Sequence, residues 1–405
     1  MVPLSQNEKH YLDNITFRWG DITSPSQQIP SCCRSPRIVR GALSNRHIGQ
    51  GLGALIMKRI VWQWPPLYLT CESIPLHNNK RPRIALVADQ FTTFSLAPDA
   101  DLIQLTPTDW QWKLRLFKPD FLFIESTWRG YKNSWQGKMA SYAHCSPNKP
   151  ELRKLLEFCR QRKIKTIFWN KEDPFHFERF ADAAALFDVV YTTDADSVER
   201  YKALPHQAFQ HVGVLMFAAQ PRWYQPADIG ERGPGVAFLG GYYGNELAER
   251  SRTQEDILYA LRDQELIIFD RFWQNNNGCS YPDKLQPYCK PAISPKSVAK
   301  AYRQYQIYLN FNTISQSSTM LSRRIFELAA AGCPIISTPS IAMENIFGKS
   351  IAVVQDGTTA HEWCVQLQQD CRQRIELGKQ AREIVLAQHT WQHRLTQLNR
   401  ELSLF

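Results

Sequence analysis

The sequence lacks three features that would place it in a specialised class of protein. It has ten cysteines but no Cys-x-x-Cys spacing, and its only close pair is Cys32 and Cys33. No apolar core follows a basic N-terminal start, and Lys58, Arg59 and two prolines interrupt the apolar residues 51–69. These absences exclude a zinc site of cysteine pairs, a signal peptide and a membrane span in this segment. We therefore expect a cytoplasmic protein with free thiols.

Acidic residues are fewer than basic ones, 38 against 48, which leaves a net charge of +10. Such a charge favours anionic partners, among them nucleotides, phosphorylated glycans and anionic lipid surfaces. No RNA-binding signature accompanies it, so nucleic acid is not expected. Residues 56–64 place two tryptophans beside two cations. This segment either contacts the inner membrane face peripherally or packs onto the following domain, and packing is favoured.

The length of 405 residues suits two domains, and a hydrophobic content of 43% is sufficient for two packed cores. We predict an irregular basic extension over residues 1–79 and a first domain over 80–220. A Pro- and Gly-rich linker is predicted over 221–235 and a second domain over 236–388. Residues 389–405 are expected to form a helix that crosses back to the first domain.

Strands alternate with helices in both predicted domains. The first has apolar strands at 84–88, 101–105, 120–125, 165–169, 187–191 and 209–215, with helices at 109–117 and 151–163. The second has strands at 236–239, 266–270, 307–312 and 350–355, helices at 246–262 and 297–305, and an irregular stretch at 271–295. This rhythm predicts an α/β protein with two Rossmann-like, doubly wound parallel sheets and C-terminal helices. A ligand is expected in a cleft between the two domains.

Residues 322–337 organise the second domain, with the sequence SRRIFELAAAGCPIIS. The stretch predicts a helix that begins at Ser322, a stop at Gly332 and a buried strand. Arg323 and Glu327 are four residues apart and share a helix face. An arginine can neutralise a diphosphate, and a carboxylate can accept hydrogen bonds from ribose hydroxyls. The alternative is an ion pair on a solvated helix face.

Gly240 and Gly241 link the first strand of the second domain to its first helix. Glycines let the backbone approach a diphosphate, and the helix N-terminus favours its charge. Arg250 lies within that helix and is a candidate phosphate ligand. A tight turn and a surface arginine are the alternatives.

The sequence NKEDPFH at residues 170–176 follows a buried strand directly. Asn170 and His176 are candidate substrate ligands there, and Glu172 or Asp173 is a candidate base for the acceptor hydroxyl. The alternative is that Asp173 or Asn170 caps the helix that begins near His176, with Glu172 solvated.

Two further polar stretches follow strands. Glu125 and Trp128 are candidate acceptor ligands, with the indole stacked on a sugar; the alternative is a turn with a buried tryptophan. Asp194 and Asp196 have the spacing of a metal-binding Asp-x-Asp motif, but they open a helix. Capping is therefore the favoured role, and we expect no metal.

Several of these stretches resemble one family. Residues 323–332 resemble the R-x-F-E-x-x-A-x-G signature of group 1-type glycosyltransferases with the GT-B fold, in particular the CgeB-like branch. FWNKEDP at 168–174 resembles a hallmark of that branch, and 389–394 resemble its H-T-W…R ending. The resemblance implies that Glu327 binds the donor ribose. Thr319 stands where many relatives have a second glutamate.

The resemblance implies a metal-independent glycosyltransferase that moves a sugar from a nucleotide-sugar donor to a glycan or cell-surface polymer. The nucleotide-sugar is a co-substrate, and no cofactor is expected. Arg323 would stabilise the departing diphosphate. Two alternatives stay open: a phosphotransferase of the same fold that uses a CDP-activated polyol, and a catalytically degenerate scaffold that binds a glycan or a partner enzyme.

Overall fold

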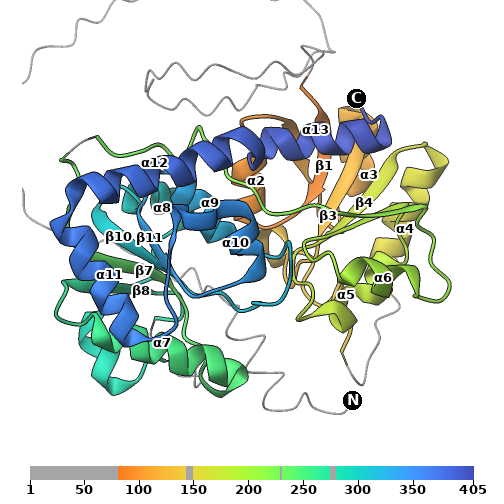
Figure 1. Ribbon diagram of the computed structural model, residues 1–405. Coiled ribbons are helices and arrows are strands. Elements are labelled where there is room, and N and C mark those ends of the chain that lie inside the picture. Colours follow the sequence, from red (N-terminus) through yellow and green to blue (C-terminus); the bar gives the residue numbers. More distant parts are fainter. Residues whose placement is uncertain (1–80, 143–148, 229, 274–279) are drawn as a thin grey trace, which may run out of the picture. The chain divides into compact units, whose positions relative to one another are not determined.

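The computed structural model describes residues 81–142, 149–228, 230–273 and 280–405, so the predicted extension 1–79 lies outside the described residues. Within them, twelve strands form two sheets of six, and every strand pair is parallel (Figure 1). The described residues belong to one compact unit that contains both sheets. The predicted α/β class with two doubly wound domains is confirmed.

The first sheet has the strand order β2-β1-β3-β4-β5-β6. Its strands are β1 (Arg83–Val87), β2 (Asp101–Gln104), β3 (Phe121–Glu125), β4 (Lys165–Asn170), β5 (Val189–Thr192) and β6 (His211–Val214). Its helices are α2 (Gln90–Leu96), α3 (Trp110–Phe117), α4 (Pro150–Gln161), α5 (Phe177–Ala184) and α6 (Ser197–Lys202), with the 3-10 turn η1 (Tyr131–Asn133). All five residues of β3 are buried, as a strand covered by helices on both faces requires.

The second sheet has the order β12-β11-β10-β7-β8-β9. Its strands are β7 (Gly233–Gly240), β8 (Leu266–Asp270), β9 (Cys289–Pro291), β10 (Tyr305–Asn310), β11 (Ile335–Ser337) and β12 (Ala352–Val353). The helices are α7 (Ala248–Ala260), α8 (Val298–Ala301), α9 (Arg323–Ala330), α10 (Ile341–Phe347), α11 (Gly357–Gln369), α12 (Cys371–Gln388) and α13 (Trp391–Leu402). Four 3-10 turns complete the unit: η2 (Gly244–Leu247), η3 (Asp283–Tyr288), η4 (Pro295–Ser297) and η5 (Gly348–Ser350).

The structure corrects the sequence prediction at several places in the second domain. Strand β7 begins at Gly233, inside the predicted linker 221–235, and the strand predicted over 350–355 is limited to β12. Residues 271–295 were expected to be irregular, but they contain η3 and the edge strand β9. The helix expected over 297–305 ends at Ala301, and β10 begins at Tyr305, two residues before the expected start. A three-residue strand carries too little periodicity to be recognised in sequence.

The last helix packs on the first sheet. The Trp391 indole meets the Trp169 indole edge to face, with ring centroids 5.6 Å apart, and the Tyr191 hydroxyl donates to Glu401 at 2.6 Å. Thr390 starts α13 with a reciprocal capping box to His393. The helix therefore contributes to the core of the first domain, although α12 directly before it contacts α9 of the second.

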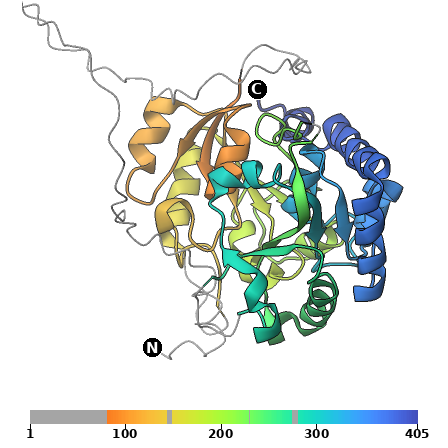
Figure 2. The same cartoon turned by 90° about the vertical axis from the view of Figure 1, so that its left-hand side faces the viewer.

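Helix α12 approaches the backbone at the end of α9, and α11 and α12 lie beside the second sheet in both ribbon views (Figures 1 and 2). Gly332 has φ +63°, the left-handed conformation that ends a helix. Gly378 of α12 lies against it, and a Cβ at Gly378 would be 2.4 Å from the Gly332 carbonyl oxygen. The close helix packing therefore depends on glycine at both positions.

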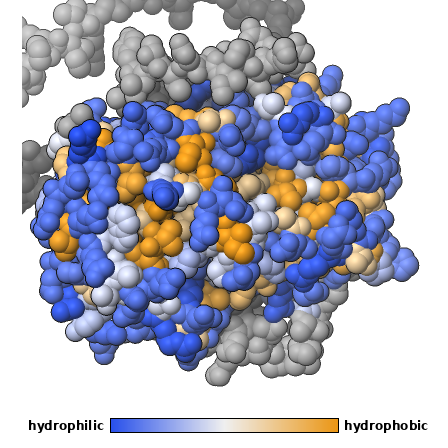
Figure 3. Space-filling model, viewed as in Figure 1, coloured by the Kyte–Doolittle hydropathy of each residue, from blue (hydrophilic) through white to orange (hydrophobic). Residues whose placement is uncertain are grey.

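Apolar side chains on the outer surface form separate patches among polar ones on the face that Figure 3 shows. Among the described residues, no helix combines the length and the apolar composition needed to cross a bilayer.

We predict that Gly378→Ala destabilises the protein by about 1–3 kcal/mol, the usual cost of overpacking. At a free helix position the same change would instead stabilise by about 1 kcal/mol. Urea unfolding measures the difference. Gln380→Ala is the control because Gln380 is exposed on the same helix, and its effect should stay within about 0.5 kcal/mol. A stabilised Gly378→Ala protein would contradict the contact with Gly332.

Candidate functional site

The predicted site residues follow strands at the carboxyl edges of both sheets. In the first domain Glu125 ends β3, Asn170 ends β4, and Glu172 and Asp173 follow β4. In the second domain Gly240 ends β7. Because all strands of a parallel sheet end at one edge, each domain brings its polar residues together there.

A buried ion cluster occupies this edge of the first sheet. The Lys171 ammonium lies 2.6 Å from Asp89 and 3.0 Å from Glu125. Glu125 also accepts hydrogen bonds from the backbone N–H of Asp89 and from the Thr92 hydroxyl, both at 2.5 Å. Glu125 is fully buried, so in this structure its carboxylate supports Asp89 and Lys171 and is not accessible to an acceptor.

The members of this cluster titrate differently. Burial and the charge of Asp89 raise the pKa of Glu125 to about 7, although Lys171 opposes the change. Burial also acts to raise the pKa of Asp89, but the cations Lys171 and Arg323 outweigh it and lower that pKa. Burial opposes the charge of Lys171, yet the two carboxylates raise its pKa. Asp89 is therefore the carboxylate that keeps its charge, and it lies near a cation of the second domain.

Glu172 is half-buried next to this cluster. Burial raises its pKa, and the cations Lys171 and Arg271 oppose that rise. Its carboxylate accepts a hydrogen bond from the Trp128 side chain. Arg271 follows β8 of the second sheet, so Glu172 is the predicted base candidate that faces the second domain.

Asp173 lies in a different environment, with no exposed surface. One of its carboxylate oxygens accepts from Asn170 at 2.7 Å, and the other accepts from Thr192 at 2.7 Å and Tyr201 at 2.9 Å. Burial raises the pKa of Asp173 to about 7. Neither Asp173 nor Asn170 caps α5, whose N-cap is His176. Both side chains instead tie the β4–α5 loop to β5 and α6.

Trp128 is only 7% exposed, which leaves little of its face for stacking on a sugar. Its ring packs edge to face on His176 at 5.1 Å and on Phe180 at 5.0 Å. Burial and Arg179 lower the pKa of His176 to about 4, so the imidazole is neutral near pH 7. The exposed aromatic ring in this loop belongs to Phe175, which is 50% exposed and was not singled out from the sequence.

The glycine turn of the second domain is tightly packed. A Cβ at Gly240 would lie 2.4 Å from the Phe238 ring and 2.9 Å from an Arg324 nitrogen, and one at Gly241 would lie 2.4 Å from Phe272. The Tyr281 hydroxyl and the Arg271 N–H both donate to the Gly240 carbonyl. Larger side chains would therefore displace Arg324 and Phe272 from the turn.

Three arginines surround this turn. The Arg250 guanidinium lies 5.2 Å from the Tyr243 ring and that of Arg324 lies 5.0 Å from the Phe238 ring, while Arg271 follows β8. Burial lowers the pKa of Arg250, and the charge of Arg324 lowers it further. Burial likewise lowers the pKa of Arg324, and the charge of Arg271 adds to that decrease. In the part of the chain that the structure describes, no carboxylate lies within 4.0 Å of the three, and Arg250 Nε is buried without a hydrogen-bond partner. These cations repel one another, and Glu172 and Glu327 act on Arg271 and Arg324 only from beyond ion-pair distance.

Arg323 faces another direction. It forms an ion pair with Glu327 at 2.8 Å, without hydrogen-bond alignment, and its guanidinium lies 3.6 Å from the Phe91 ring of the first domain. Glu327 is 1% exposed and receives hydrogen bonds from Tyr224 and Tyr302. Its role at the ribose stays a prediction. Ser322, the N-cap of α9, donates to Asn310 at 3.2 Å.

Further contacts join the domains beside α9. The Thr319 hydroxyl donates to the Thr193 carbonyl at 3.0 Å and accepts from the Ala195 N–H at 2.9 Å. The Ser317 hydroxyl donates to Asp194 at 2.5 Å, and Asp194 also accepts from the Ser197 N–H. The position where many relatives of the resembled family carry a glutamate is therefore part of a domain contact.

Asp194 and Asp196 do not form a metal centre with other ligands. Across the described ranges, no group of three or more histidine, cysteine, aspartate or glutamate side chains could hold a metal ion.

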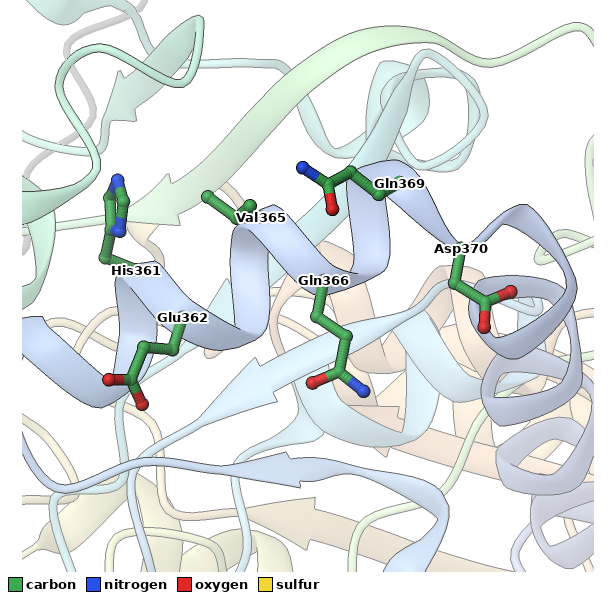
Figure 4. A pocket seen from close by; sticks show the side chains of 6 residues that line it. All are labelled: His361, Glu362, Val365, Gln366, Gln369 and Asp370. Carbon is green, nitrogen blue, oxygen red and sulfur yellow. The ribbon is translucent and has the colours of Figure 1, made fainter.

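A hollow of about 600 Å³ lies elsewhere, on the outer side of α11. It is lined by His361, Glu362, Val365, Gln366, Gln369 and Asp370. Figure 4 shows that these side chains, five from α11 and Asp370 from its junction with α12, spread in different directions and do not converge on a point. The hollow thus lacks the convergent polar groups of a donor site.

Arg324, Arg271 and Asp89 were not predicted as site residues from the sequence. Arg324 is adjacent to Arg323 and was available as the second cation of the helix. Arg271 and Asp89 both follow buried strands, which is the signal that identified Glu172. Only the packing distinguishes the arginine that faces the glycine turn from the one that faces Glu327.

We predict that Asp173→Ala lowers the free energy of unfolding by about 3 kcal/mol, because three buried donors lose their acceptor. Chemical unfolding of both proteins measures this loss. Glu178→Ala in α5 is the control: the Glu178 side chain is 84% exposed, and its effect should be within about 0.5 kcal/mol. Equal stability of the two variants would contradict a structural role for Asp173.

Sequence comparison identifies one related segment. Residues 251–400 match the profile of a family described as "Glycosyl transferase-like". This range contains Arg271, Ser322, Arg323, Arg324 and Glu327, whereas Gly240, Gly241 and Arg250 precede it. Comparison with curated protein sequences finds no match.

Solved structures extend the likeness to both domains. HepE of Anabaena, in complex with UDP and glucose, matches with a TM-score of 0.51 and 12% identity, over 80% of this chain and 92% of HepE. BGT of phage T4, in complex with its UDP-glucose substrate, matches with a TM-score of 0.51 and 9% identity, over 80% of this chain and 98% of BGT. The described chain therefore has the GT-B fold, and residues 251–400 are glycosyl transferase-like in sequence.

Proposed function

We propose that this protein is a glycosyltransferase that uses a nucleotide-sugar donor, and that the second domain holds the donor diphosphate at the β7 glycine turn. The observation that carries the proposal is the group of Arg250, Arg271 and Arg324, none of which has a carboxylate within 4.0 Å among the described residues. Clustered cations are costly in the unliganded protein, and a diphosphate would remove that cost. Arg324 takes the place that the sequence suggested for Arg323.

Three observations support a nucleotide-sugar as the anion. The site lies at the carboxyl edge of a parallel sheet, where glycines and helix N-termini suit phosphates. Residues 251–400 match a glycosyl transferase-like family, and the structures of HepE and BGT with this fold contain UDP or UDP-glucose. We propose UDP-sugars as the first donors to test.

In the proposed reaction, the acceptor hydroxyl attacks the anomeric carbon as the bond from that carbon to the diphosphate oxygen breaks. Negative charge grows on the diphosphate, and Arg250 and Arg324 stabilise it. Glu172 takes the hydroxyl proton as the carbon–oxygen bond forms. The Trp128 side chain orients Glu172, and Lys171 opposes its protonation. Sugar, acceptor and proton are thereby brought together between the two carboxyl edges.

Arg323 and Glu327 have a positioning role in this proposal. Arg323 contacts Phe91 and lies near Asp89, so it connects the donor-binding helix α9 to the first domain. Glu327 holds Arg323 through their ion pair. The Glu327 carboxylate is itself buried and hydrogen-bonded by two tyrosines. No metal is required, because the arginines supply the positive charge. His176 packs on Trp128 and His211 lies 3.5 Å from Glu401, so neither contact supports the alternative of phosphoryl transfer.

The donor site is tested with Arg250→Gln/Arg324→Gln and the control Arg252→Gln, since Arg252 is exposed on the same helix. UDP at 100 times its Kd should stabilise wild type by about 2.7 kcal/mol. The double variant should lose at least about tenfold in UDP affinity, and its unliganded form should be more stable than wild type, because burial opposes the charge of both arginines.

Thermal unfolding measures the stability of each variant, and calorimetric titration with UDP, GDP, CDP and CMP measures its nucleotide affinity. Unchanged nucleotide affinity in the double variant would contradict the site. If none of the nucleotides stabilises the folded wild-type protein, the donor proposal fails and a glycan-binding scaffold becomes the better explanation.

The base is tested with Glu172→Gln. Turnover of the donor identified above should fall by about 10²–10⁴-fold, with unchanged nucleotide affinity. Because the pKa of Glu172 is raised and the ionised form is active, wild-type turnover should fall with decreasing pH through an apparent pKa above the usual glutamate range. Glu178→Gln should behave as wild type. A Glu172→Gln enzyme with turnover within a few-fold of wild type would assign the base elsewhere.

A further inference from the structure

Helix α3 exposes two large apolar side chains on one face. Leu116 is 62% exposed and Trp112 is 52% exposed, and no large hydrophobic side chain in the described ranges is more exposed than these two. They are four residues apart, so they lie next to each other on the helix surface. Trp110 and Leu114 of the same helix are buried against the first sheet. The helix is thus apolar on its outer face as well as on its inner one.

Three cations lie on helix α3 or next to it. Arg115 lies between Trp112 and Leu116 in sequence, and its guanidinium is 5.4 Å from the Phe158 ring centroid of α4. Arg162, just beyond α4, lies over the same ring at 3.7 Å. Lys118 follows α3 and is exposed. We call Trp112, Arg115, Leu116, Lys118 and Arg162 the α3 patch.

The acidic groups near the patch are already engaged. Asp109 forms an ion pair with Lys113 at 2.6 Å, and Asp120 accepts from the Arg83 N–H at 2.7 Å. Glu157 of α4 has Arg160 at 4.0 Å. No acidic residue occurs between positions 110 and 118. The three cations of the patch therefore present a net positive field around Trp112 and Leu116.

We propose that the α3 patch binds an anionic lipid surface. Arginine and lysine attract lipid headgroups, while tryptophan and leucine insert at the boundary of headgroup and acyl chain. Charge complementarity favours lipid over an apolar protein groove, because three uncompensated cations would be costly to bury there. The exposed leucine favours lipid over nucleic acid, because a leucine side chain can neither stack on a base nor form a hydrogen bond with it.

The position of the patch agrees with this role. Helix α3 follows β2 and precedes β3 in a parallel sheet, so its C-terminal end, with Leu116, lies toward the amino edge of that sheet. Glu172 and Asp89 lie at the carboxyl edge. Attachment through the patch would leave the proposed site free for substrates. This inference does not depend on the proposed function.

Vesicle co-sedimentation of the full chain tests the proposal. The probes are vesicles of phosphatidylcholine alone and vesicles that also contain phosphatidylglycerol. Wild type should bind only the anionic vesicles, and high salt should weaken that binding. Trp112→Gln/Leu116→Gln should weaken binding at least about tenfold, and Arg115→Gln/Arg162→Gln by about fivefold per arginine. Tyr259→Gln/Ile375→Gln is the matched control, with exposures of 42% and 46%, and should bind as wild type.

Circular dichroism melting checks that each variant is folded. Wild-type-like binding by the folded Trp112→Gln/Leu116→Gln protein would overturn the proposal, because the contact would then lie outside the α3 patch. Absence of wild-type binding to anionic vesicles, equal binding to neutral vesicles, or equal weakening by the control pair would also overturn it. If a DNA duplex binds wild type as tightly as the anionic vesicles do, the assignment to lipid fails.

Discussion

The arrangement of this structure depends on one constraint: its buried charged side chains are placed at the carboxyl edges of the two parallel sheets. A parallel strand that is buried on both faces has few places for polar residues except its ends. The carboxyl ends of all strands in a sheet lie at one edge, so polar residues that are distant in sequence become neighbours there. Asp89, Glu125 and Lys171 come from three different strand ends and form one cluster.

Buried charges are arranged differently at the carboxyl edges of the two sheets. In the first domain, one ammonium group is shared by two carboxylates, and Arg323 of the second domain is a further cation near Asp89. In the second domain, Arg250, Arg271 and Arg324 face a glycine turn, and no carboxylate in the described part of the chain lies within 4.0 Å of them. A buried cluster of paired carboxylates and cations is a structural support, whereas buried cations without an ion-pair partner point to an anionic ligand. This asymmetry is why we assign the donor to the second domain and the base to the first.

The contacts between the domains lie beside the same groups. Arg323 reaches the Phe91 ring, Thr319 bonds to the backbone of the β5–α6 loop, and Ser317 bonds to Asp194. Helix α13 adds a second connection, because it follows the second domain in sequence and packs in the core of the first. These contacts thereby hold helix α9 and the loop before it at the edge of the first sheet.

The sequence by itself determined the α/β class, the two parallel sheets and most strand positions, because buried strands and amphipathic helices have periodicities that survive without tertiary context. It also located Glu172 and the glycine turn at strand ends and Arg323 on the helix that begins at Ser322. It could not separate Arg323 from Arg324, or Glu172 from Asp173, because adjacent residues differ only in the direction of their side chains. That direction is decided by packing: Asp173 is enclosed by three donors while Glu172 faces the second domain, and Arg324 faces Gly240 while Arg323 faces Glu327.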